Sequence, residues 1–266
     1  MSRLRFTILG CGSSGGVPRI GNDWGACDPE NPKNRRTRCS MLVERLGPEG
    51  VTRVLIDTSP DMREQLLRTG ISTLDAVLFT HSHSDHVNGL DDLRQLVFIS
   101  HRRVPVWADG RTQYELMSRF GYAFVQPEGS SYPPICDLHT IKGPVTITGA
   151  GGAITLDPFD VDHGDIEALG FRIGGLAYIP DVLSIPEPVW QSHLAGLDWL
   201  VVDALRRRPH PTHTHLALTL EWIARATPKR AVLTNMHVDL DHATLQAETP
   251  DHVSAAYDGM VLELGD

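Results

Sequence analysis

Cysteine is scarce in this 266-residue chain, which has four: Cys11, Cys27, Cys39 and Cys136. No two of them form a C-x-x-C pair, so we expect a reducing compartment and no disulfide framework. Long apolar runs are also missing: no stretch approaches the length of a membrane span, and no apolar signal region follows the first residues. These absences predict a cytoplasmic protein without a membrane partner.

Positive charge is in the minority, because the formal net charge is −9 at pH 7. This balance argues against an extended nucleic-acid partner, since binding to a polyanion draws most of its affinity from Lys and Arg. A small anionic ligand needs only a local cluster of positive charge. The chain length and the 41% hydrophobic content allow a sizeable core, and a homodimer stays open.

Hydrophobic patterning predicts a chain of many short strands interrupted by helices. Ser59 and Pro60 are typical of a helix start, which predicts a helix over 60–68 that ends at Gly70. Further helices are expected at 89–100, 112–120 and 217–226. Strands are expected at 5–9, 40–46, 52–56, 75–80, 104–107, 145–147, 153–156, 169–173, 176–180, 198–202 and 231–236. The stretch 121–143 is expected to be irregular.

The segment His81-Ser82-His83-Ser84-Asp85-His86 follows the buried strand expected at 75–80. Three imidazoles and a carboxylate within six residues are the ligand types of divalent metal sites. In a loop, the two halves of H-x-H-x-D-H can bind two neighbouring ions, His81 and His83 one ion, Asp85 and His86 the other. The alternative is a polar surface turn that is rich in histidine.

The hexad, followed by Asn88-Gly89-Leu90, resembles the metallo-β-lactamase superfamily. The whole chain is similar to its branch of phosphoribosyl cyclic phosphate phosphodiesterases. The resemblance implies an α/β fold, a four-layer αββα sandwich in which two mixed β-sheets are flanked by helices. It also implies a single domain over 1–266 with two similar halves, approximately 1–143 and 144–266.

The same resemblance implies the remaining metal ligands and a cofactor of two divalent ions, Zn or Mn. His163 would be the third ligand of the first ion, Asp181 would bridge both ions, and His237 would complete the second. The branch carries its last ligand at the position of Asn235, so His237 requires a local shift of the backbone. Asp57 would hydrogen-bond a ligand histidine from behind.

The stretch Gly10–Gly16 formally satisfies the G-x-G-x-x-G dinucleotide pattern, but we reject that interpretation. Val17-Pro18 follows where a helix should start, and no acidic residue ends a second strand about twenty residues on. We expect a tight loop near the metal site whose amides face a phosphate, or an ordinary Gly-rich turn. The candidate phosphate contacts are Ser13, Ser14, Arg19, Arg35, Arg36 and Arg206, although such arginines are often a solvated face.

The loop before Leu216 contains His210, His213 and His215. In the resembling branch a histidine of this loop acts on the scissile phosphate, and alignment through Leu216 favours His213, with His215 left open. Together with Asp85, these two are the candidate catalytic residues. The branch also holds a structural zinc with several cysteines, of which only Cys27 and Cys39 remain here, so that site stays undecided.

These residues predict hydrolysis of a phosphodiester in a small phosphate-containing substrate, a ribose or nucleotide phosphate that is cyclic or open. A thioester hydrolase of the glyoxalase II type shares the ligands and stays open. A transfer-RNA 3′ processing nuclease shares the hexad but fits the acidic balance poorly. A flavodiiron oxidoreductase is disfavoured, since that branch has Glu at the position of His83. A metal-free binding protein is the non-enzyme alternative.

Overall fold

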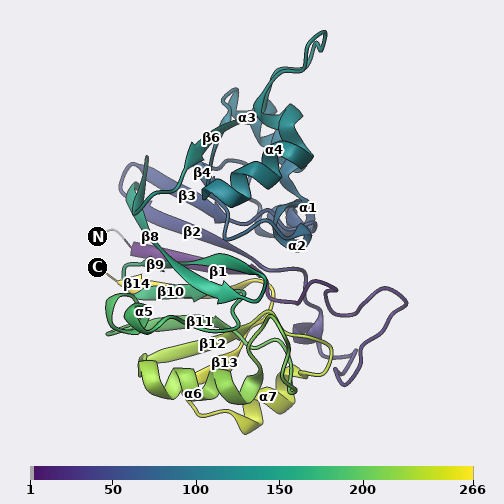
Figure 1. Ribbon diagram of the computed structural model, residues 1–266, viewed down its shortest axis with the longest axis vertical. Coiled ribbons are helices and arrows are strands. Elements are labelled where there is room, and N and C mark those ends of the chain that lie inside the picture. The colour runs from purple at the N-terminus through teal and green to yellow at the C-terminus, as the bar shows by residue number, and fades with distance from the viewer. Residues whose placement is uncertain (1–2, 266) are drawn as a thin grey trace. The chain divides into compact units, whose positions relative to one another are not determined.

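The computed structural model describes residues 3–265, whose strands form two mixed sheets of seven strands each (Figure 1). The first sheet has the order β14-β1-β2-β3-β4-β5-β6. Its strands are β1 (Arg3–Gly10), β2 (Ser40–Gly47), β3 (Gly50–Ile56), β4 (Ala76–Leu78), β5 (Val104–Ala108), β6 (Cys136–Thr140) and β14 (Met260–Gly265). β2 and β3 pair antiparallel, whereas β3, β4, β5 and β6 run parallel.

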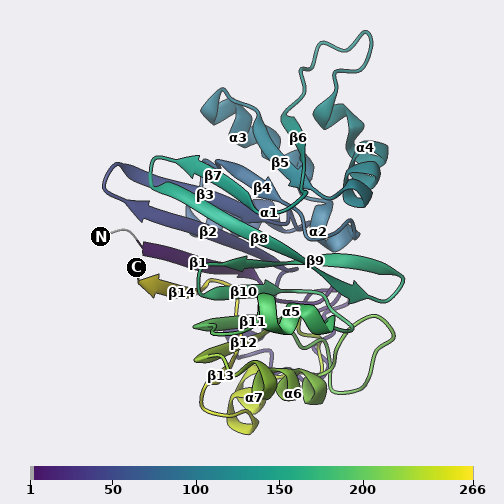
Figure 2. The same ribbon diagram turned by 60° about the vertical axis from the view of Figure 1, so that its left-hand side comes forward.

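The second sheet has the order β13-β12-β11-β10-β9-β8-β7. Its strands are β7 (Val145–Gly149), β8 (Gly152–His163), β9 (Ile166–Ile173), β10 (Leu176–Ile179), β11 (Trp199–Asp203), β12 (Arg230–Thr234) and β13 (Val253–Ala255). β9 and β10 form the hairpin expected across Gly174 and Gly175, and β10 to β13 run parallel. Figure 2 shows β9 to β12 in succession, with α6 (Leu216–Ala226) and α7 (His242–Glu248) beside them.

By their contacts, the described residues divide into two compact units. The first comprises 3–9, 40–155 and 261–265, and the second comprises 10–39 and 156–260. The units therefore differ from the predicted halves, since the segment 10–39 belongs to the second unit and the C-terminal strand to the first. The prediction of one domain stays a prediction.

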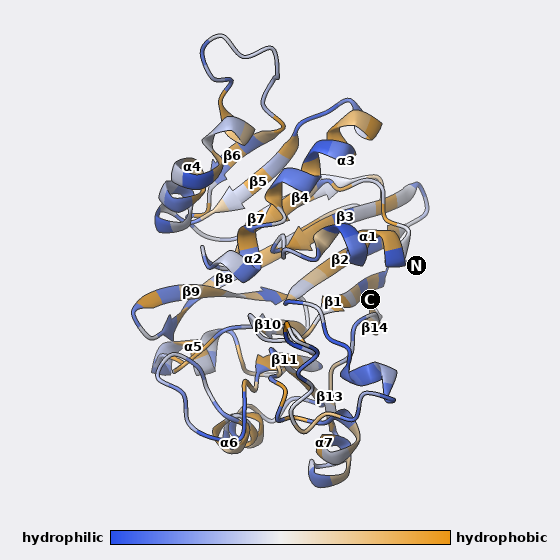
Figure 3. Cartoon of the chain, turned by 90° about the vertical axis from the view of Figure 1, so that its right-hand side faces the viewer, coloured by the Kyte–Doolittle hydropathy of each residue, from blue (hydrophilic) through white to orange (hydrophobic). Residues whose placement is uncertain are grey.

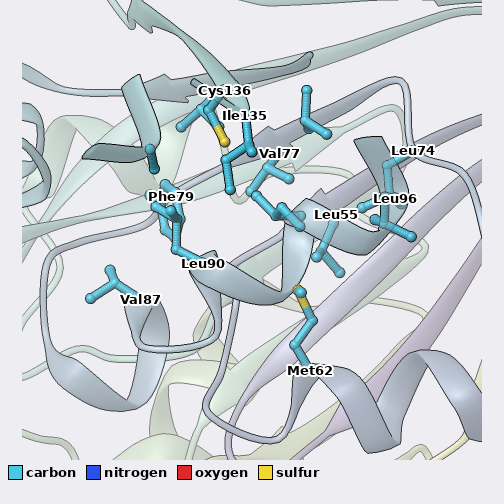
Figure 4. Close-up of a cluster of buried hydrophobic side chains, with 14 of the residues drawn as sticks. Leu55, Met62, Leu74, Val77, Phe79, Val87, Leu90, Leu96, Ile135 and Cys136 are labelled. Carbon is cyan, nitrogen blue, oxygen red and sulfur yellow. The ribbon is translucent and has the colours of Figure 1, made fainter. Parts of the chain in front are cut away.

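The core of the first unit lies between its sheet and the helices α1 (Met62–Thr69), α3 (Leu93–Ser100) and α4 (Gly110–Phe124). Figure 4 shows part of it, with Leu55 from β3, Val77 from β4 and Phe79 directly after β4 in one cluster with Met62 and Leu90. The strand β4 is apolar throughout and fully buried, as expected for a central parallel strand. In Figure 3, α3 shows both hydrophobic and hydrophilic segments.

Several expected element boundaries were wrong. α1 begins at Met62 rather than Pro60, and the Ser59 hydroxyl accepts a hydrogen bond from the backbone N–H of Asp61 instead of capping the helix directly. Gly70 ends α1 with φ +69°, as predicted. The helix expected over 89–100 is a 3-10 turn at Leu90–Asp92 followed by α3, and the irregular stretch 121–143 contains the end of α4 and all of β6.

The remaining short helices are α2 (Ser84–Val87), α5 (Glu187–Ser192) and a 3-10 turn at Pro32–Asn34. Among the described residues, no helix combines the length and the apolar character needed to cross a membrane.

Candidate metal centre

In the first unit, the hexad leaves β4 and enters α2. His83 is the N-cap residue of α2, so Asp85 and His86 lie on a helical turn rather than in an open loop. The imidazole centroids of His81 and His83 are 4.6 Å apart, and those of His81 and His86 are 4.3 Å apart. His81 and His86 are buried, whereas His83 is exposed. The sequence therefore gathers three imidazoles at the carboxyl end of one strand.

Asp57 orients two of these histidines. β3 and β4 are parallel neighbours with Ile56 opposite Leu78, so Asp57 follows β3 directly beside the residues that follow β4. One carboxylate oxygen of Asp57 accepts the backbone N–H of Thr80 at 2.8 Å. The other is 2.8 Å from both the Thr80 hydroxyl and His86 Nδ1. Burial raises the pKa of Asp57, and the bonds from His86 and Thr80 offset part of that rise.

These bonds fix which imidazole nitrogen carries the proton. Since the Asp57 carboxylate accepts, His86 Nδ1 donates, and the lone pair of His86 lies on Nε2. The Thr80 hydroxyl donates to Asp57 and so accepts from His81 Nδ1 at 3.0 Å, which leaves the lone pair of His81 on Nε2 as well. An oxygen partner on one ring nitrogen is the usual arrangement behind a metal-binding histidine.

In the second unit, His163, Asp181 and His213 come together. Asp181 Oδ1 is 4.0 Å from His163 Nε2 and 3.6 Å from His213 Nδ1, and the two imidazole centroids are 4.5 Å apart. One potential ligand atom from each of the three lies within 4.8 Å of the others, so the group can hold a metal ion. His163 Nδ1 donates to the Thr212 carbonyl at 2.7 Å, which again leaves the lone pair on Nε2.

Three adjacent parallel strands position the polar groups of this unit. Ile179 lies opposite Val202, and Asp203 lies opposite Thr234, so β10, β11 and β12 end side by side. Asp181, Asp203 and Asn235 therefore meet at their carboxyl ends, where α/β sheets place their sites. Asn235 has φ +57°, a left-handed conformation that Asn tolerates better than most residues. Its amide donates to Asp181 Oδ1 at 3.1 Å.

Asp203 is a candidate site residue that the sequence analysis did not identify. It is fully buried, and one of its oxygens lies 2.7 Å from His213 Nδ1 and accepts the backbone N–H of Val182 at 3.2 Å. Burial raises the pKa of Asp203 to about 7, against the lowering effect of His213. A carboxylate at the end of a buried strand was the available signal, because Asp57 and Asp181 also lie within two residues of a strand end.

His237 lies in none of the metal-capable groups found among the described residues. Its Nδ1 is 3.2 Å from Asp239 Oδ1, and its Nε2 contacts a guanidinium nitrogen of Arg19. Burial and the Arg19 charge lower the pKa of His237. For His237 to bind an ion through Nε2, the Arg19 contact would have to break.

The other predicted contacts lie in diverse environments. Arg36 is buried and donates to the Leu240 carbonyl at 2.7 Å, so it lies in the interior and not on an exposed rim. Arg206 donates to the carbonyls of Arg208 and Pro209 in its own loop. Ser13 is buried and Ser14 exposed, while the exposed Arg35 lies over the Trp24 ring.

Of the two candidate catalytic histidines, only His213 lies in the group with His163 and Asp181. His215 is the N-cap residue of α6 and makes no side-chain capping bond. Cys27 and Cys39 are free buried thiols, and neither belongs to a metal-capable group within residues 3–265.

The donor set suits a divalent ion of borderline hardness. The histidines His81, His86 and His163 each direct Nδ1 toward an oxygen acceptor and keep a lone pair on Nε2, and Asp181 offers a carboxylate oxygen. Asp85, whose Oδ2 is 3.6 Å from His86 Nε2, lies in none of the metal-capable groups among the described residues. The predicted ligands that the structure brings together are therefore chemically suited to a divalent metal ion.

Comparison with known proteins agrees with this chemistry. A family model described as β-lactamase superfamily domain matches residues 52–236. The crystal structure of a protein described as a new diphosphatase from the PhnP family is 37% identical and covers 99% of this chain and 98% of its own, with a TM-score of 0.88. This likeness confirms the predicted fold class.

Two curated relatives also match. Octanoyltransferase of Porphyromonas gingivalis (strain ATCC BAA-308 / W83) is 34% identical over 264 residues, which are 97% of this chain and 51% of that protein. The chain thus spans about half the length of this relative. Coenzyme PQQ synthesis protein B of Pseudomonas fluorescens (strain SBW25) is 28% identical, over 97% of this chain and 99% of that protein.

Proposed function

The chain belongs to the β-lactamase superfamily and is a hydrolase, and we propose that it cleaves a phosphodiester in a small ribose or nucleotide phosphate, cyclic phosphates included. The observation that carries the proposal is His213, whose imidazole lies beside the metal-capable pair His163 and Asp181 and is backed by the buried carboxylate of Asp203. Such an imidazole can serve phosphoryl chemistry at a metal centre.

We propose two divalent ions, Zn or Mn, as the cofactor. His81, His83 and His163 would hold one ion, Asp85 and His86 would hold the other, and Asp181 would serve both. The resemblance adds His237 as a ligand of the second ion, which requires the contact between His237 and Arg19 to break. Bound ions would polarise the phosphate and make a water molecule acidic enough to ionise near neutral pH.

The side chains around the ions would orient the reacting groups. Asp57 keeps Nε2 of His86 free of its proton, and the Asn235 amide holds one oxygen of Asp181 in a fixed direction. With Nδ1–H donated to Asp203, neutral His213 carries its lone pair on Nε2. The buried Asp203 carboxylate also stabilises the imidazolium form, so His213 can give a proton to the leaving alkoxide.

Hydrolysis of a diphosphate is the second candidate. The solved structure at 37% identity is described as a diphosphatase, and the same groups would act on a phosphoanhydride as on a phosphodiester. The two reactions differ in the leaving group, because a departing phosphate needs less help from a proton donor than an alkoxide does. Removal of His213 should therefore reduce diester cleavage more than diphosphate cleavage.

The test is turnover by chelator-stripped protein to which Mn or Zn is returned. The substrates are bis(p-nitrophenyl) phosphate, a nucleoside 2′,3′-cyclic phosphate, inorganic diphosphate and a thioester. Metal-restored cleavage of the diesters supports the proposal, and cleavage of diphosphate alone favours the second candidate. Thioester cleavage without cleavage of any of the phosphate substrates would favour the glyoxalase II type of function.

His83→Ala is the matching variant, because His83 is exposed and its loss leaves the core untouched. We expect His83→Ala to abolish turnover while the far-ultraviolet circular dichroism stays unchanged. His252→Ala, which also removes an exposed histidine, is the control and should retain activity. Retained activity in His83→Ala would contradict the proposed centre.

A further inference from the structure

Arg119, a residue of α4, bonds to the backbone of the hexad and has no role in the chemistry above. Its guanidinium donates a hydrogen bond to the carbonyl oxygen of Ser82. Ser82 lies between His81 and His83, the two histidines of the hexad that are proposed to bind the same ion. The bond therefore joins α4 to the middle of the metal-binding segment, 37 positions earlier in the chain.

The two ends of the hexad are anchored to the loop that follows β3. Before the hexad, Thr80 donates to the Asp57 carboxylate from its backbone N–H and from its hydroxyl, each at 2.8 Å. After the hexad, the Thr58 hydroxyl donates to the Val87 carbonyl at 3.2 Å. Neither anchor involves Ser82, so the bond from α4 is a separate constraint on the middle of the segment.

The Arg119 guanidinium is held by its own helix. Its Nε donates to the Glu115 carbonyl at 3.4 Å, and its Nη2 lies 3.7 Å from Glu115 Oε2. The helix is tied in turn to the neighbouring strands, because the Gln113 amide donates to the carbonyls of Ala108 and His139 at 3.1 and 2.9 Å. The constraint on the hexad therefore comes from a helix that is itself bonded to β5 and β6.

The charge of Arg119 and its bond to Ser82 would have opposite effects on a bound metal ion. A guanidinium repels a nearby divalent cation, so loss of the charge alone would tighten metal binding. Loss of the bond would instead free the backbone between two imidazoles whose centroids are 4.6 Å apart, and ligands that are less preorganised bind more weakly. His83 is exposed, so packing alone does not fix its position. The sign of the change in metal affinity therefore distinguishes the two effects.

We propose that Arg119 is a positioning residue of the metal centre, which fixes the backbone between His81 and His83 so that both imidazoles are in place before an ion binds. This inference rests on the proposed function, because it concerns the proposed cofactor. The planar guanidinium suits the task, since its several N–H groups bond to Ser82 and Glu115 at once. A Lys ammonium on a flexible stem is less restrained, so we expect Lys to replace Arg119 only in part.

The first test is metal affinity, measured by competition against a fluorescent chelator in wild type, Arg119→Gln, Arg119→Lys and Arg102→Gln. Arg102 is an exposed arginine of the same unit and controls for the lost charge. We expect Arg119→Gln to bind Zn or Mn about 10-fold more weakly, at the lower end of the range for residues that support metal ligands. Arg119→Lys should lose less, and Arg102→Gln should match wild type. Unchanged or tighter binding by Arg119→Gln would overturn the proposal.

The second test is backbone hydrogen exchange in the metal-free protein, which requires neither an ion nor a substrate. The amides of His86 and Val87 donate to the His83 carbonyl and report on opening at this point. Their exchange should be about 10-fold faster in Arg119→Gln than in wild type, as for loss of a charged hydrogen bond, while the amides of β3 exchange as before. Equal acceleration throughout the first unit would reveal a general loss of stability and would overturn the positioning role.

The two tests also separate this inference from the function on which it rests. If wild type binds no divalent ion, the proposed metal centre fails whatever Arg119 does. If wild type binds ions and cleaves phosphate substrates while Arg119→Gln has the same metal affinity and the same exchange rates, only the role of Arg119 fails.

Discussion

Replacing Asp57 by Asn should weaken metal binding by the hexad without disturbing the fold of the first unit. Asp57 has φ +64°, a left-handed conformation that Asn adopts about as readily as Asp. The two side chains have the same shape, and an Asn carbonyl oxygen can still accept the backbone N–H of Thr80. The substitution therefore changes one oxygen into an amide nitrogen and little else.

That single atom reverses the hydrogen bond to His86. The new amide nitrogen donates, whereas the carboxylate oxygen, 2.8 Å from both His86 Nδ1 and the Thr80 hydroxyl, accepts. His86 must then accept at Nδ1 and carry its proton on Nε2, the nitrogen that would bind the ion. Loss of such an oriented partner typically costs about 10- to 100-fold in metal affinity, which corresponds to about 1.4 to 2.7 kcal/mol.

The assay is competition for Zn or Mn against a fluorescent chelator, with nitrogen-15 spectra of the histidines to report the tautomer of His86. Asp137→Asn, at an exposed carboxylate paired with Arg103 at 3.1 Å, is the matched control and should bind metal like wild type. If Asp57→Asn binds both ions with wild-type affinity, or if His86 keeps its proton on Nδ1, the argument from orientation is refuted.

Three other predictions concern stability, measured by chemical denaturation. Asp241→Ala should cost about 1 to 2 kcal/mol, because Asp241 caps α7 through the backbone N–H of Thr244 and accepts the Asn34 amide at 2.6 Å. Burial raises the pKa of Asp241, but these hydrogen bonds outweigh burial and lower the pKa to about 2. The contribution of Asp241 to stability is therefore complete above the unfolded pKa of about 4 and is lost as the pH falls toward 2. Asp241→Asn should flatten the dependence of stability on pH in this range. Glu44→Gln should cost about 1 to 3 kcal/mol, since the buried carboxylate accepts from Arg5 at 2.8 Å and from Arg53 at 3.1 Å, both partly exposed. Gly89→Ala should destabilise the first unit, because its Cβ would lie 2.1 Å from the Ser59 carbonyl oxygen, and an unchanged unfolding midpoint would contradict that clash.

The parts of the centre that were predictable from the sequence are those whose spacing is local. The hexad presents its ligand types within six residues, so composition alone indicates a metal site. His163 and Asp181 required the family resemblance, because each is an ordinary residue at the end of a strand. The rejection of a dinucleotide-binding motif at Gly10–Gly16 was also correct, because no helix starts in this segment. Gly12 instead forms isolated β-bridges with Arg38 and Met236.

The pairing of residues far apart in the chain was not predictable in the same way. Arg36 belongs to an arginine-rich run that is typical of a surface. Its guanidinium is nevertheless buried, and it donates hydrogen bonds to the Leu240 carbonyl and the Asn34 side chain. His237 has the sequence context of a ligand, but Arg19, 218 positions away, occupies its Nε2. Sequence spacing carries no information about such contacts, because only the register of the sheet and the course of the long loops bring them about.

In both units a buried carboxylate at the end of a strand accepts a hydrogen bond from an imidazole. Of these two carboxylates, Asp57 was predicted from the sequence and Asp203 was not. In the first unit, a buried carboxylate that follows β3, Asp57, accepts a hydrogen bond from Nδ1 of His86 in α2, the helical turn after the neighbouring parallel strand. In the second unit, Asp203 ends a parallel strand and binds Nδ1 of His213 in the loop that follows. The histidines attract attention because metal and acid–base chemistry require them, whereas a carboxylate at a strand end is common. Its role depends on a fold that brings the strand end beside an imidazole, across two parallel strands for Asp57 and through the loop after the same strand for Asp203. A search for buried acids at the ends of parallel strands is the rule that would have found Asp203.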